Sequence, residues 1–159
     1  MEKVKYILLL VLSALYVLPV TIEDVSCVQG SAWYTCLICQ FFHANILHLA
    51  CNAYALWLLH FTLGDFIAAY IISIVSVSLS TVPVVGASSF IYALAAFRMS
   101  GARLGRYEWM AFFVLNAVTI VIPSISFIVH ISSFSLGYLF YKIRIVEHGY
   151  RSYCKRKQK

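Results

Sequence analysis

The chain has 159 residues and a formal net charge of +6, with 62% hydrophobic and 11% charged residues. Soluble domains are about half apolar and about a quarter charged, so this composition excludes an ordinary soluble domain and indicates a polytopic membrane protein. The length accommodates about six spans of about 20 residues with short loops, and it leaves no room for a separate soluble domain.

Six apolar segments follow one another along the chain. They cover about residues 6–20, 44–63, 66–79, 88–97, 109–122 and 126–143. Each is predicted to be a transmembrane helix, and the third and fourth are close to the lower length limit. We therefore expect an all-α membrane protein, a bundle of six transmembrane helices that forms a single domain over residues 1–159.

The basic residues predict the orientation of this bundle. All twelve Lys and Arg lie in residues 3–5, 98–106 and 142–159, which six spans place on one side. The positive-inside rule puts that side in the cytoplasm, together with both termini and the basic tail that starts at about residue 142. The tail is then expected to contact the anionic lipid bilayer, and no nucleic acid partner is expected. The first segment lacks a small-x-small cleavage site and is expected to remain as a span.

The five cysteines leave two alternatives open. Cys27, Cys36 and Cys39 lie in or beside the loop between the first two segments, and Cys51 and Cys154 lie apart from them. The C-x-x-C spacing of Cys36 and Cys39 has no partner pair for a zinc site, so no metal is expected. The three loop cysteines either pack as small apolar residues or form a disulfide in an oxidising compartment.

The second segment carries polar side chains in the stretch HANILHLACN, residues 43–52. His48 and Asn52 are four residues apart and share one face of a helix, and His43 lies near the start of the segment. Polar groups at membrane depth are costly and face another helix or a polar cavity. They either join two helices through hydrogen bonds or line a functional site.

The fourth segment opens with a glycine followed by two serines. Gly86 lets the chain turn tightly before Ser88, which is placed at a helix N-terminus where free backbone N–H groups favour negative charge. That position suits a nucleophile whose reaction builds an oxyanion. Tyr92 lies one helical turn later on the same face. The alternative is a serine that only caps the helix.

The sixth segment contains a candidate base. Ser133 and Gly137 have the small-xxx-small spacing that lets helices approach closely, and His130 lies three residues before Ser133. If the partner helix is the fourth segment, His130 reaches Ser88. The two residues then form the minimal Ser–His pair of an activated nucleophile.

Together these motifs resemble those of the rhomboid family of intramembrane serine proteases, over essentially the whole chain. The motifs are H-x4-H-x3-N, G-x-S-x3-Y and H-x6-G, carried here by His43, His48, Asn52, Gly86, Ser88, Tyr92, His130 and Gly137. The resemblance implies a six-helix rhomboid-like bundle, no cofactor, and transmembrane proteins as substrates. The protein is then expected to be multi-pass, and the short chain points to a bacterial inner membrane.

The resemblance also implies roles for the residues of the site. Ser88 is expected to attack the peptide bond, and His130 to act as its general base without a third carboxylate. His48, Asn52 and the Ser88 N–H are expected to bind the oxyanion. The implied function is a serine endopeptidase that hydrolyses peptide bonds in or near transmembrane segments.

Four further residues are implied to support the dyad. Tyr92 is expected to stack on His130 and hold its ring, His43 to brace the outer loop, and Gly86 to supply the turn before the serine. Gly137 completes the motif of the last helix.

The sequence departs from the family pattern at three points. Ser89 and Ser133 stand where rhomboids usually have glycines that pack against each other, and the outer loop has Trp33 without the usual arginine. Either the two serine hydroxyls compensate by hydrogen-bonding across the helix contact, or they push the helices apart and lengthen the Ser88–His130 distance.

Two other functions stay open. One is a catalytically inactive relative that binds membrane-protein clients, which the departures at Ser89 and Ser133 keep open. The other is an unrelated small transporter or channel, which needs ionisable residues along a path through the bilayer. A zinc protease is not expected, because the chain has no H-E-x-x-H motif.

Overall fold

The computed structural model describes residues 2–101 and 126–157, which are mostly helical. The helices are α1 (Glu2–Tyr16), α2 (Ile22–Val25), α3 (Trp33–Ile38), the 3-10 helix η1 (Cys39–Phe41), α4 (Ile46–Leu58), α5 (Leu63–Ser78), α6 (Ser88–Gly101) and α8 (Phe127–Lys157). In the described residues, β pairing is limited to an isolated bridge between Cys27 and Val84. The prediction of an all-α chain therefore agrees with the helix content.

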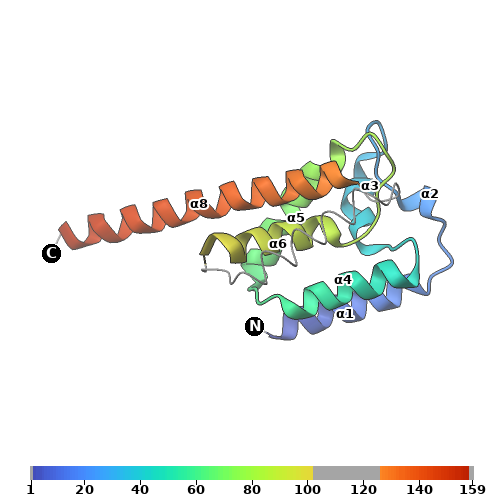
Figure 1. Cartoon of the computed structure of the whole chain (residues 1–159), viewed down its shortest axis with the longest axis horizontal. Coiled ribbons are helices and arrows are strands. Elements are labelled where there is room, and N and C mark those ends of the chain that lie inside the picture. The colour runs from blue at the N-terminus through green and yellow to red at the C-terminus, as the bar shows by residue number, and fades with distance from the viewer. Residues whose placement is uncertain (1, 102–125, 158–159) are drawn as a thin grey trace.

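The helices pack in two groups (Figure 1). Helices α1 and α4 lie side by side, and α5, α6 and α8 pack against one another. Helices α2 and α3 lie at one end of the bundle, close to where α6 and α8 begin. Helix α8 runs past the other end and carries the C-terminus away from the bundle. The first turns of α6 and α8 therefore share one end of the fold.

The predicted bundle of six transmembrane helices is wrong for this structure. Among the described residues, no helix taken alone combines the length and the apolar character that crossing a membrane requires. Only Trp33–Phe41 and Ile46–Leu58 meet that requirement as a pair, and they are bent by 80° relative to each other. The same finding contradicts the predicted multi-pass location in a bacterial inner membrane with both termini in the cytoplasm.

The physical reasons are helix length and polarity. A span needs about 20 residues, whereas α1, α4, α5 and α6 have 15, 13, 16 and 14 residues. Helix α8 has 31 residues, but His130 and several serines interrupt its apolar run, which ends at Lys142. The predicted fifth segment, residues 109–122, lies outside the described residues.

Helix α6 forms the centre of the core. Its buried residues are Ser89, Phe90, Ile91, Ala93, Leu94, Ala96 and Phe97. The alanines give α8 room to approach, because a Cβ added to Gly137 would lie 2.9 Å from the carbonyl oxygen of Ala93. Phe97 stacks on Tyr141 of α8 with ring centroids 5.8 Å apart. This contact fixes the register of α8 against α6, and with it the place of His130.

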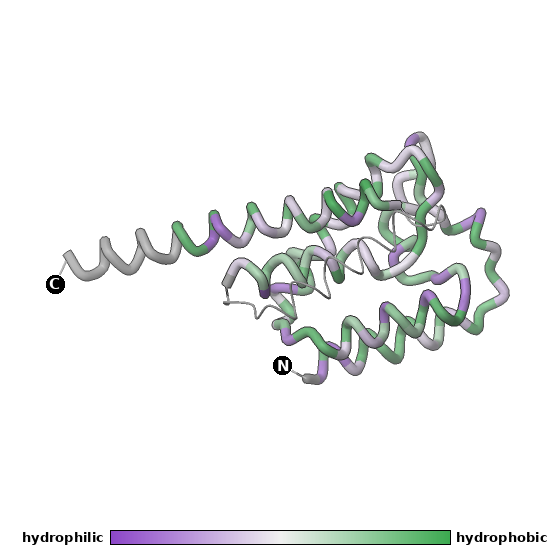
Figure 2. The backbone as a smooth tube through the Cα atoms, viewed as in Figure 1, coloured by the Kyte–Doolittle hydropathy of each residue, from purple (hydrophilic) through white to green (hydrophobic). Residues whose placement is uncertain are grey.

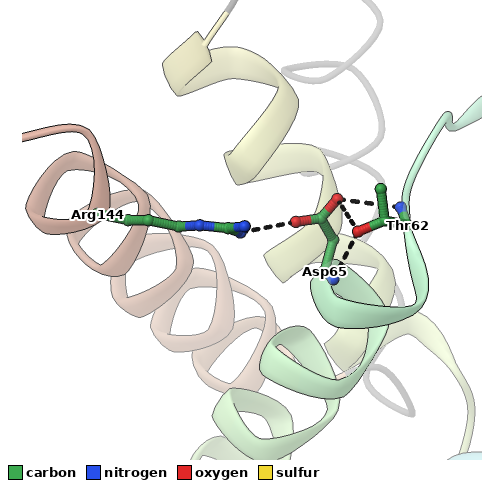
Figure 3. Close-up of polar contacts among 3 residues, drawn as sticks. All are labelled: Thr62, Asp65 and Arg144. Carbon is green, nitrogen blue, oxygen red and sulfur yellow. Dashed lines mark hydrogen bonds and ion pairs between the residues drawn. The ribbon is translucent and has the colours of Figure 1, made fainter. Parts of the chain in front are cut away.

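An ionic contact joins α5 and α8 nearer the other end of the bundle (Figure 3). Thr62 and Asp65 form a capping box, in which each backbone N–H donates to the other residue's side-chain oxygen at 3.0 and 3.1 Å. The other carboxylate oxygen of Asp65 pairs with Arg144 Nη1 at 2.9 Å. Burial tends to raise the pKa of Asp65, but the hydrogen bonds from Thr62 and Arg144 outweigh burial and lower that pKa.

Much of the surface is apolar. Figure 2 shows apolar residues recurring along α1, α4, α5 and α8. Large apolar side chains are exposed on all four helices, among them Leu10, Leu47, Ile71 and Leu139. Exposed apolar area on this scale marks interaction surfaces or needs shielding from water.

Candidate active site

Ser88 and His130 meet where α6 and α8 begin. The Nε2 atom of His130 lies 2.8 Å from the Oγ atom of Ser88, which is hydrogen-bond distance for a serine and its general base. Ser88 is the first residue of α6, and His130 lies in the first turn of α8. The α6–α8 contact thus brings together two residues that are 42 positions apart in the chain.

The surroundings of His130 keep its imidazole neutral. Only 5% of His130 is exposed. Burial, and secondarily the neighbouring His48, lower the pKa of His130 to about 4, so at neutral pH its Nε2 is able to accept a proton. Within the described residues, the buried Nδ1 atom has no hydrogen-bond partner. The ring is instead held by Tyr92, which stacks on it at 4.4 Å between centroids and 13° between planes.

His48 and Asn52 lie against the turn before the serine. Gly86 has a φ of +112°, which glycine adopts readily. A Cβ added there would lie 2.7 Å from His48 Nε2 and 3.3 Å from Asn52 Nδ2. The Asn52 Nδ2 group is buried and has no acceptor among the described residues. Two side-chain donors therefore lie beside the start of α6, where the first backbone N–H groups have no partner within the helix.

His43 contacts the residue before Ser88 directly. Its Nε2 atom accepts a hydrogen bond from the Ala87 N–H at 3.5 Å, and its ring lies edge-on to His48 at 5.1 Å between centroids. Burial, followed by the proximity of His48, lowers the pKa of His43 to about 4, and burial also lowers the pKa of His48. Three neutral imidazoles therefore surround the start of α6 at neutral pH.

The two serines that depart from the rhomboid pattern do not pair with each other. Ser89 Oγ donates to Gln40 Oε1 at 3.3 Å, while the buried Ser133 Oγ has no partner in the described part of the chain. The Ser88–His130 distance of 2.8 Å is not lengthened. Neither sequence-based alternative for these serines, a hydroxyl pair or separated helices, describes the structure.

Comparison with known proteins adds no relative. No protein-family model matches the chain, and no curated protein or solved structure matches it.

Cys27 and Cys39 pack as small apolar residues beside the site, and Cys51 is exposed. Cys27, Cys36, Cys39 and Cys51 are free thiols, and Cys27 and Cys39 belong to a buried apolar cluster. Burial raises the pKa of Cys27 to about 12. In the parts that the structure describes, no three His, Cys, Asp or Glu side chains come together to hold a metal ion.

Gln40 belongs to the site, although the sequence motifs do not reveal it. Its side chain is fully buried and touches Ser89, the residue next to Ser88. A signal for it does exist in the sequence, since Gln40 is the only amide side chain in the apolar run of residues 33–42.

Proposed function

We propose that this chain is a serine endopeptidase of the rhomboid type, which hydrolyses peptide bonds in or near transmembrane segments of membrane proteins. The observation that carries the proposal is the 2.8 Å contact between His130 Nε2 and Ser88 Oγ at the N-terminus of α6. The motifs that resemble the rhomboid family supply the substrate class.

The dyad accounts for acyl transfer in two steps. Ser88 Oγ attacks the carbonyl carbon while His130 Nε2 takes its proton, and the imidazolium then gives that proton to the leaving amine. Water attacks the resulting ester in the second step, with His130 again as base, and the proton returns to Ser88. The lowered pKa of His130 keeps it in the neutral form that begins each step.

The donors around Gly86 account for stabilisation of the oxyanion. The Ser88 N–H, His48 and Asn52 offer three hydrogen bonds near the first turn of α6, where the helix dipole also favours negative charge. An unpartnered buried donor such as Asn52 Nδ2 costs free energy in the resting protein. A developing oxyanion supplies the missing acceptor, which favours the transition state over the resting state.

The surroundings of the site suit an apolar substrate segment. Ile46 and Leu47 precede His48, Ile131 follows His130, and all three are exposed. An extended peptide with apolar flanks buries these side chains on binding, and each buried apolar side chain favours association.

The test is labelling of the purified protein by a fluorophosphonate probe, in detergent that shields the exposed apolar side chains. We expect wild type to be labelled and Ser88→Ala to lose labelling completely. His130→Ala is expected to be labelled about 10²–10⁴-fold more slowly, the range for loss of a general base. Cleavage of a membrane-protein reporter with one transmembrane segment is expected to show the same dependence.

Two matched controls separate chemistry from folding. Ser132→Ala removes a hydroxyl of α8 that donates to the carbonyl of Val129 in its own helix, and His60→Ala removes an exposed histidine near the other end of the bundle. Both variants are expected to be labelled at the wild-type rate. If folded wild type remains unlabelled, the proposed protease activity is wrong.

A further inference from the structure

We propose that Gln40 is a positioning residue for the nucleophile, which it holds in place through Ser89. The inference rests on the proposed function, because the position of Ser88 matters only if Ser88 reacts. Gln40 lies outside the motifs that indicate the dyad, and Ser89 is a position at which the chain departs from the rhomboid pattern.

Gln40 connects three parts of the fold from a fully buried position. Its Oε1 atom accepts from the hydroxyl of Ser73 on α5 and from Ser89 Oγ on α6 at 3.3 Å. Its Nε2 group donates to the carbonyl of Cys36 on α3 at 3.3 Å. The amide thus uses its oxygen to bind two helices and its nitrogen to bind a third.

Residues next to Gln40 accept two further hydrogen bonds from the segment just before Ser88. The carbonyl of Cys39 accepts from the Gly86 N–H at 2.9 Å. His43 Nε2 accepts from the Ala87 N–H at 3.5 Å. Residues 39–43 therefore contact Gly86 and Ala87, which precede Ser88, and Ser89, which follows it.

The Ser89–Gln40 bond is the contact that follows the nucleophile. Ser89 is 1% exposed, so its hydroxyl has no access to water and depends on Gln40 for a partner. Without that bond, the first turn of α6 is held by the contacts at Gly86 and Ala87 and by the buried Phe90 and Ile91, and we expect a small shift at Ser88. A displacement of about 1 Å at a reacting atom can reduce a rate about 10²-fold, so loss of this bond acts on the reaction through the place of Ser88 Oγ.

The first experiment compares fluorophosphonate labelling of Ser89→Ala and Ser76→Ala. Ser76 is a matched control, because it is a buried serine whose hydroxyl, within the described residues, bonds only the Ile72 carbonyl of its own helix at 3.1 Å. We expect Ser89→Ala to lower the maximal labelling rate about 10-fold with unchanged probe affinity, and Ser76→Ala to leave both unchanged. Equal rates for the two variants would overturn the proposal.

A second set of variants tests whether Gln40 is responsible for the effect of Ser89 on the labelling rate. Gln40→Leu is expected to lower the labelling rate at least as much as Ser89→Ala, and the double variant to be no slower than Gln40→Leu alone. Gln40→Glu rescues labelling at the pH where its buried carboxyl is protonated, because that group offers one acceptor and one O–H donor. Additive effects of the two single variants, or no pH-dependent rescue, contradict a role that acts through Ser89.

Amide hydrogen exchange keeps the inference testable apart from the reaction. In Ser89→Ala, residues 86–92 are expected to exchange faster than in wild type, with no change in Ser76→Ala. This result holds whether or not the probe labels Ser88. If wild type is not labelled but residues 86–92 exchange faster in Ser89→Ala, the protease function is rejected and the Ser89–Gln40 contact is kept. If exchange is unchanged in Ser89→Ala, the role of that contact is rejected.

Discussion

The ring of Tyr92 lies flat on the ring of His130, 4.4 Å away between centroids and tilted by only 13°. The two residues come from different helices, α6 and α8, and Tyr92 is one turn after Ser88 on α6. One helix therefore carries both the proposed nucleophile and the aromatic ring that stacks on its proposed base. His130 Nδ1 has no hydrogen-bond partner in residues 2–101 and 126–157, so we expect this stacking to help hold Nε2 toward Ser88.

Removing the Tyr92 ring is expected to release the base. Tyr92→Ala leaves His130 free to turn, and we expect labelling of Ser88 to slow by about 10²-fold. Tyr92→Phe retains the stacked ring and is expected to keep most of the wild-type rate. Labelling rates of the two variants, measured beside their unfolding midpoints, check the prediction. A Tyr92→Ala rate equal to that of Tyr92→Phe would show that stacking does not align the base.

The lowered pKa of His130 predicts the acid limb of the pH profile. The imidazole accepts the serine proton only when it is neutral, so the labelling rate is expected to fall as pH drops through about 4. An exposed histidine places that limb near pH 6.5. Burial is the main cause of the shift, with His48 adding to it. Labelling rates are measured between pH 3.5 and 8 on samples that remain folded. They show whether the midpoint of the acid limb lies near pH 4 or near pH 6.5.

The apolar segments predict where helices lie along the chain. They do not predict whether those helices are long enough to span a membrane. The segments predicted at residues 66–79 and 88–97 overlap α5 (Leu63–Ser78) and α6 (Ser88–Gly101). The second predicted segment begins inside the bend that separates η1 from α4. Composition reports how apolar a segment is, whereas spanning also requires an unbroken helix of about 20 residues, and breaks depend on local caps. Asn45 is such a cap, since its side chain accepts from the His48 N–H at 2.8 Å.

The candidate site likewise has residues that the sequence predicts and one, Gln40, that it does not predict. Spacing indicates Ser88, Tyr92 and His130, because residues four apart on a helix share a face and a small-residue seam predicts that another helix packs beside His130, although it does not say which one. Spacing does not indicate Gln40, because its partners Ser73 and Ser89 are 33 and 49 positions away. Periodicity within one helix carries no information about such contacts. They depend on the path of the loop between α1 and α4.

Gly86 is expected to tolerate no side chain. A Cβ there would lie 2.5 Å from His48 Cε1 and 2.7 Å from His48 Nε2, so Gly86→Ala displaces a donor of the oxyanion site. We expect a loss of labelling of at least about 10²-fold, as for removal of one such donor. Gly30→Ala is the matched control, because Gly30 also has positive φ, +90°, but open space around it. If both variants lose the same activity, backbone strain rather than the His48 contact is responsible.

The three histidines near Ser88, of which His43 and His130 are buried, are expected to make stability depend on pH. The pKa values of His43, His48 and His130 are lowered in the folded chain, mainly by burial, whereas unfolded histidines have pKa values near 6.5. Between about pH 4 and 6.5 the unfolded chain therefore binds more protons, so stability rises with pH across this window and is lost as pH falls through it. Urea midpoints at pH 4.5, 5.5, 6.5 and 7.5 measure this slope, and His43→Gln is expected to flatten it. A midpoint independent of pH would contradict burial of these imidazoles.

Gly137 is expected to control the distance between α6 and α8. A Cβ at this position would lie 2.9 Å from the carbonyl oxygen and 3.0 Å from the Cα atom of Ala93, and backbone atoms cannot move aside as a flexible side chain does. Gly137→Ala is therefore expected to destabilise the fold by about 1–3 kcal/mol, the range for overpacking, and to slow labelling because His130 moves with α8. Gly64→Ala on α5 is the control, since its Cβ meets only Thr62 Oγ1 at 3.8 Å, and it is expected to be neutral or stabilising. Urea unfolding and labelling of both variants provide the test, and equal behaviour of the two would show that α6 and α8 are not in close contact at Gly137.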